Sequence, residues 1–194
     1  MGEKQIKYIE KIKQLELQHT HEWWHYWLNY SSFTHWRFWV VFALLTLPLV
    51  ALLFLMDKRK SLQIGFFGYS VHVFFTYIDA FGASKGYWFY PYKVFPVLPS
   101  SFSLDVSFVP VSYMLVYQWT LTHQKNYYVY MFGLSVVFSF IIKPIMEALR
   151  LFQFDKGANF VYLLLGYIAV GVIAKMITDF FLFLQKKAKR KETA

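Results

Sequence analysis

Long, uninterrupted apolar blocks constrain this chain more than any other feature of its sequence. The first block, from Phe38 to Met56, contains no charged residue. A water-soluble core needs apolar residues at intervals, whereas about 20 consecutive apolar residues are enough to cross the hydrocarbon of a bilayer. With 57% hydrophobic and only 16% charged residues, the chain is predicted to be an integral membrane protein.

Five blocks are long enough to be predicted as spans. They lie at 38 to 56, 62 to 79, 106 to 122, 127 to 145 and 160 to 184. Short polar turns at 57 to 61 and 122 to 126 require the spans that flank them to be antiparallel hairpins. We therefore expect an all-α fold, a polytopic membrane helix bundle of about five transmembrane helices that occupies residues 35 to 185.

The segment from 1 to 34 has a different pattern. Lysine and glutamate alternate along it, and Tyr8, Ile12 and Leu15 form a narrow apolar stripe at helical spacing. Such a stripe predicts an amphipathic helix that lies on the membrane or against a partner instead of folding alone. The tryptophans that follow are typical of an aromatic belt at the membrane interface.

The net charge of +9 comes mainly from short loops and tails. Membrane orientation and anionic lipid explain such a distribution better than nucleic acid does, so no nucleic-acid partner is expected. Lysines and arginines near span ends number nine on one side, at 58, 59, 60, 125, 186, 187, 189, 190 and 191, and six on the other, at 37, 85, 93, 143, 150 and 156. Positive charge on the inside predicts an external N-terminus and a cytoplasmic basic tail at 186 to 194.

One motif suggests a metal. His21, Glu22 and His25 form an H-E-x-x-H pattern, which on a helix places two imidazoles and a carboxylate as zinc hydrolases do. A catalytic zinc needs a third protein ligand, and only His19, His35 or a distant acid could supply it. The two tryptophans inside the motif also favour an interfacial anchor. We therefore expect no cofactor, with zinc as the alternative, and the absence of cysteine excludes thiolate metal sites.

A second group of polar residues falls within or beside the spans, where ionisable groups are costly and therefore suggest function. The pattern predicts an outer-face vestibule made of His72, Asp79, Asp105, Lys143 and Glu147, roofed by Tyr87, Trp88, Tyr90 and Tyr92. Opposite charges there would offset each other's desolvation. The alternative is structural, because most of these groups sit near span ends, where long side chains reach water and aspartates cap helices.

Several of these positions also carry a resemblance. In order and spacing, Asp57-Lys58, Asp79, Gly82, Trp88, Tyr90-Pro91, Pro96, Asp105, Pro110, Tyr113-Met114 and Tyr117-Gln118 resemble an uncharacterised family of small five-span integral membrane proteins of Gram-positive spore-forming bacteria. The resemblance covers residues 35 to 185 and implies about five spans in a bacterial cytoplasmic membrane, without an established activity. This chain departs from the family in having Lys143-Pro144 where Glu-Pro is usual, and in its H-E-x-x-H motif. The chain also has a fainter similarity to membrane-embedded lycopene cyclases, but it lacks their paired glutamates.

These observations predict a non-catalytic membrane component that contacts the bilayer and binds a protein partner, a second copy of itself or a small ligand at the vestibule. Two alternatives stay open. One is a membrane enzyme, using zinc at the H-E-x-x-H motif or acid-base catalysis by Asp79 and His72, and the other is a small transporter or proton-coupled channel.

Overall fold

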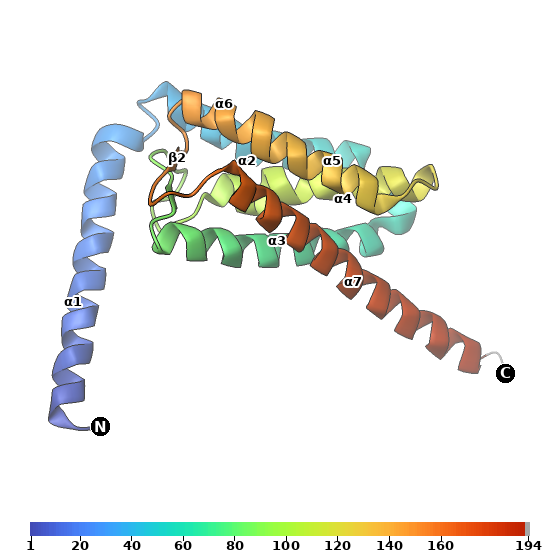
Figure 1. The fold of residues 1–194 in the computed structure, drawn as a ribbon, viewed down its shortest axis with the longest axis horizontal. Coiled ribbons are helices and arrows are strands. Elements are labelled where there is room, and N and C mark those ends of the chain that lie inside the picture. Colours follow the sequence, from blue (N-terminus) through green and yellow to red (C-terminus); the bar gives the residue numbers. More distant parts are fainter. Residues whose placement is uncertain (193–194) are drawn as a thin grey trace.

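The computed structural model describes residues 1–192 and consists of helices apart from one pair of two-residue strands (Figure 1). The helices are α1 (Glu3–Tyr26), α2 (Trp36–Leu55), α3 (Ser61–Ser84), α4 (Val109–Thr122), α5 (Tyr127–Val137), α6 (Lys143–Ala148) and α7 (Phe160–Glu192). Shorter helical segments are η1 (Trp27–Ser31), η2 (Lys58–Lys60), η3 (Leu104–Phe108) and η4 (Phe138–Ile142), and the strands are β1 (Trp88–Phe89) and β2 (Gln153–Phe154). The all-α prediction is confirmed.

Four helices are long and apolar enough to cross a membrane. They are Trp36–Leu55, Lys58–Ser84, Tyr127–Ala148 and Phe160–Lys191. The remaining predicted span is also helical, because η3 continues directly into α4, but it is shorter and more polar than these four. The chain is therefore a multi-span membrane protein, and the crossing of the bilayer by α4 stays a prediction.

The bundle is built around α3 and α4, whose inner faces pack closely. Phe67 of α3 lies against Tyr117 of α4, with ring centroids 4.3 Å apart. At Gly68 a β-carbon would stand only 2.2 Å from the sulfur of Met114, so this contact requires a residue without a side chain. Small residues allow helices in a membrane to approach in this way.

Helix α1 leaves the bundle and lies across its end (Figure 1). None of its residues is buried, and its contacts with the rest of the chain come from its last turns and η1. Trp23 stacks on Phe89 at 5.3 Å, and the Trp27 indole nitrogen donates to the Lys93 carbonyl oxygen at 2.9 Å. That this helix lies on the membrane surface, as an interfacial helix does, stays a prediction.

The loop from 85 to 103 covers the same end of the bundle. It is held by antiparallel pairing of β1 with β2 and by the Lys156 ammonium, which donates to the Lys85 carbonyl oxygen at 2.7 Å. Gly86 has φ of +70°, where a side chain would be strained. The sequence did not predict the strand pairing, because two residues are too few to produce a strand pattern.

At the opposite end, the Tyr117-Gln118 pair joins the first hairpin to α4. The Gln118 amide accepts from the Asp57 backbone nitrogen at 2.7 Å and donates to the Leu55 carbonyl oxygen at 2.8 Å. Beyond this point α7 diverges from the bundle (Figure 1) and stays helical to Glu192. The last two residues of the predicted basic tail, 193–194, lie outside the described residues.

Candidate functional site

The site begins with Asp79, near the end of α3. Its side chain is buried, and three donors from the 85–103 loop reach it. The Trp88 indole nitrogen and the Tyr90 hydroxyl donate to Oδ1 at 2.9 Å and 2.6 Å, and the Ser101 backbone nitrogen donates to Oδ2 at 3.2 Å. Hydrogen bonds to a charged acceptor are stronger than neutral ones, so Asp79 holds the loop against the bundle.

Lys143 enters the site from α6. It is 1% exposed, and its ammonium donates to the Tyr90 hydroxyl at 2.8 Å and lies 4.0 Å from the centre of the Phe152 ring. Tyr90 therefore accepts from Lys143 and donates to Asp79. Burial and the charge of Asp79 raise the pKa of Tyr90 well above its usual value, which keeps the phenol protonated as this donor.

Asp105, in η3, is the second acid. It is 1% exposed, and neither of its carboxyl oxygens has a hydrogen-bond partner within residues 1–192. The Asp79 carboxyl and the Ser100 hydroxyl lie close by. Leaving a buried polar group unpaired costs about 1–3 kcal/mol, and more for a charged group. Asp105 therefore has hydrogen-bonding capacity that the geometry of the described chain leaves unfilled, with the Ser100 hydroxyl and the Asp79 carboxyl beside it.

Serine hydroxyls share this property. Ser100, Ser103, Ser107 and Ser139 are buried, and within the described part of the chain their hydroxyl oxygens have no hydrogen-bond partner. Buried polar groups in proteins are normally paired with protein or with ordered water. Together with Asp105 they make this end of the bundle interior polar and incompletely paired.

A second buried lysine, Lys93, was not predicted as a site residue. Its ammonium donates to the carbonyl oxygens of Leu98 and Pro99 at 2.6 Å and 3.0 Å and lies 3.9 Å from the centre of the Trp23 ring. Burial lowers the pKa of Lys93 to about 8, opposed by the charges of Asp79 and Asp105. The sequence signal was only a lysine among loop aromatics, which is equally typical of an exposed loop.

The other two predicted residues differ in position. His72 borders the site: its Nδ1 lies 2.8 Å from the Asp105 carbonyl oxygen and 3.4 Å from the Thr76 hydroxyl. Glu147 is exposed near the end of α6, outside the cluster. The structure thus brings together Asp79, Trp88, Tyr90, Asp105 and Lys143, which we call the vestibule cluster.

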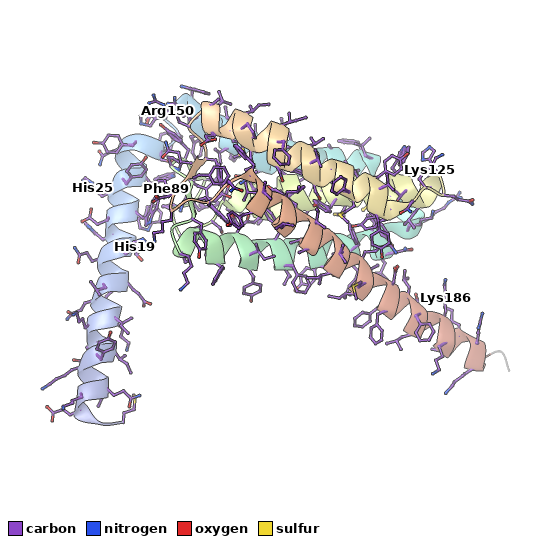
Figure 2. All side chains as sticks on the ribbon, viewed as in Figure 1. His19, His25, Phe89, Lys125, Arg150 and Lys186 are labelled. Carbon is purple, nitrogen blue, oxygen red and sulfur yellow. The ribbon has the colours of Figure 1, made fainter. Side chains whose placement is uncertain are left out.

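The H-E-x-x-H residues lie apart from this cluster. His21, Glu22 and His25 are exposed on α1, where Figure 2 labels His19 and His25. His19 Nε2 accepts from the Trp23 indole at 3.0 Å, and Trp23 in turn packs on Phe89. Across residues 1–192, no three histidine or acidic side chains are grouped so that they could hold a metal ion.

Two hollows meet at Trp88. A cavity of about 20 Å³ inside the bundle is bordered by Asp79, Lys143 and Tyr167, and it has room for about one water molecule. A groove of about 440 Å³ lies outside, between α1 and the 85–103 loop, and includes His19, Trp23, Trp88, Phe89 and Leu98. The Trp88 indole lines both, so it separates the outer groove from the buried acid.

Comparison with known proteins found no matching family model, no similar curated protein and no similar solved structure. The class is therefore defined by the fold and the site alone. The chain is a multi-span, all-α membrane protein in which a loop rich in aromatic residues closes over buried acids and lysines.

Proposed function

We propose that this protein is a non-catalytic membrane component that binds a small polar ligand at the vestibule cluster. The observation that supports this most is the Asp105 carboxyl, which is buried while both oxygens lack a partner within residues 1–192. A neighbouring acid, Asp79, has three donors in the same place. The contrast favours Asp105 as the acceptor that a ligand would use.

The surroundings restrict the ligand's chemistry. Two acids and two lysines, Asp79, Asp105, Lys93 and Lys143, are buried here, so a ligand would meet groups of both signs. Free carboxyl oxygens and serine hydroxyls call for hydroxyl or amide hydrogens. The inner cavity admits about one water, so most of the ligand would occupy the outer groove, whose size suits small molecules.

Two measurements, an experimental structure and native mass spectrometry, test this proposal together. An experimental structure of the purified protein is expected to show non-protein density within hydrogen-bonding distance of the Asp105 carboxyl. Native mass spectrometry should then detect the corresponding added mass in the wild type and in Glu147→Gln, a matched loss of an exposed acid, but not in Asp105→Asn. The absence of non-protein density at Asp105, together with the absence of an added mass in all three proteins, would contradict the proposal.

The placement in the cell is also a proposal. The bacterial cytoplasmic membrane is proposed from the family resemblance alone, three of whose positions, Asp79, Trp88 and Tyr90, are joined by hydrogen bonds in this chain. The basic turns support an external N-terminus and a cytoplasmic C-terminus. Lys125 and Arg150 lie at opposite ends of the bundle in Figure 2.

A protein partner or a second copy could bind the exposed face of α1.

Orientation can be measured directly because the chain contains no cysteine. In intact cells, an impermeant thiol reagent should label Lys85→Cys and should label Lys125→Cys only after the membrane is opened. The opposite pattern would reverse the proposed orientation.

A second candidate function is proton transfer. The hydrogen-bond chain from Lys143 through Tyr90 to Asp79, with steps of 2.8 Å and 2.6 Å, favours it. Proton transfer along this chain would serve either of the two alternatives from the sequence, the small transporter and the acid-base enzyme. Tyr90→Phe removes the middle group, so proton flux into liposomes that contain the protein should fall, whereas Tyr87→Phe, a change in an exposed neighbour, should leave the flux unchanged.

A further inference from the structure

A cleft at the other end of the bundle has a composition unlike the vestibule cluster. It has a volume of about 540 Å³ and opens where α7 diverges from α3 (Figure 1). Its lining comes from η2 and the first turns of α3 on one side and from α7 on the other: Arg59, Lys60, Leu62, Gln63, Phe66, Thr178, Phe181, Leu182 and Gln185.

The cleft is amphiphilic. Arg59 and Lys60 supply positive charge at the turn, and neither takes part in a salt bridge within residues 1–192. The walls along the helices are apolar, and Phe66 and Phe181 face each other edge to face with ring centroids 5.2 Å apart. A charged mouth above apolar walls matches a molecule with an anionic head and a hydrocarbon body.

Among the residues that the structure describes, no acid lines the cleft. Asp57 accepts from the Arg59 backbone nitrogen at 2.9 Å and caps η2, while Asp179 is bound to the Lys175 ammonium. The Asp57 carboxylate keeps its charge beside η2, but the three bases of the same turn, Lys58, Arg59 and Lys60, outnumber it, so the field at the cleft is positive.

Positive charge continues along α7. Phe183, Lys186, Lys187 and Arg190 line a second hollow of about 340 Å³, and Figure 2 labels Lys186 on the part of α7 that projects from the bundle. The cleft lies where the first two spans end, at Leu55 and Lys58, which is the depth of the lipid headgroups.

We propose that this cleft binds an anionic phospholipid, with the phosphate at Arg59 and Lys60 and the acyl chains against Leu62, Phe66 and Phe181. Guanidinium groups bind phosphate oxygens in pairs, and basic pockets between membrane helices suit acidic headgroups. The proposal is independent of the function proposed for the vestibule cluster.

A lipid titration tests the site on the full chain in detergent. Phosphatidylglycerol is expected to bind the wild type, and Arg59→Gln/Lys60→Gln should weaken its binding by about 10- to 30-fold, because two cations near the phosphate are lost. Lys11→Gln/Lys13→Gln on α1 removes the same charge elsewhere and should leave the affinity unchanged. Helical circular dichroism checks that each variant folds.

Two further arms separate the lipid from simpler ligands. Phosphatidylcholine, which has no net charge, and glycerol phosphate, which has no acyl chains, should each bind much more weakly than phosphatidylglycerol. Phe181→Gln should reduce binding of the lipid without affecting glycerol phosphate. Equal affinity for the two lipids, or equal losses in the two double variants, would overturn the proposal.

Discussion

The two ends of the bundle use similar charged residues in opposite ways. At the end covered by the 85–103 loop, Asp79 and Lys143 are buried and are joined through Tyr90. At the other end Asp179 and Lys175 form a direct ion pair on α7, with nearly half of the Asp179 side chain exposed. At the loop end, burial makes the charged groups part of a network that holds the loop. At the other end they form a partly exposed pair within one helix.

The largest expected effect is the loss of stability when the buried acid Asp79 is removed, compared with removal of Asp179 at the other end. Asp79→Ala leaves three donors without their acceptor and removes a negative charge near the buried Lys143 ammonium, so the free energy of unfolding should fall by about 3–5 kcal/mol, as when a buried ion pair loses one partner. Asp179→Ala breaks a pair in which Asp179 is 49% and Lys175 is 16% exposed, and should cost less, about 1 kcal/mol. Denaturant titration in detergent measures both, and equal losses would remove the distinction between the two ends.

A smaller effect is expected from one methyl group. Gly82→Ala places a β-carbon 2.0 Å from the Trp88 ring, which must move and weaken its bond to Asp79. The cost should be about 1–3 kcal/mol, with a shift in tryptophan fluorescence. The matched change Gly133→Ala meets nothing within 4 Å and should be neutral or slightly stabilising. Identical behaviour of the two variants would show that Trp88 is not closely packed.

The last effect is a pH dependence from Lys93. Its pKa is lowered from 10.5 to about 8 in the folded chain, so between these values the unfolded chain binds more protons and the free energy of unfolding should rise with pH. Below pH 8 the lysine is charged in both states and adds no slope. Lys93→Met should lose this rise and Lys85→Met, an exposed control, should keep it. The measurement is thermal unfolding across pH 7.5 to 10, and a slope that survives in Lys93→Met would contradict the assignment.

The sequence predicted the helices well because their cause is local. Length and apolar content decide whether a segment can span a bilayer, and both can be read from residues such as those of 38 to 56. The more polar stretch at 106 to 122 is helical as predicted, but its packing against α3 includes tertiary contacts, such as Met114 over Gly68, that no single segment reveals.

The site could be predicted only in part. Helical spacing and shared span ends indicated that Asp79, Asp105 and Lys143 would meet, because spans of similar length bring their ends to the same depth. The same argument also selected Glu147, which lies one helical turn too far toward the exposed end of α6. Lys93, Ser100 and Ser103 were missed because the path of the loop, and not any local pattern, turns them inward.

Trp88 lies between the outer groove, which molecules can enter, and the buried Asp79 carboxyl. Its indole is one wall of the outer groove and also one of the donors to Asp79. A molecule that pushed the ring aside from the groove would remove a hydrogen bond from the buried acid, and loss of that hydrogen bond would in turn loosen the wall. Occupancy of the groove and the hydrogen bond between Trp88 and Asp79 are therefore thermodynamically coupled, each changing the other's free energy by the same amount.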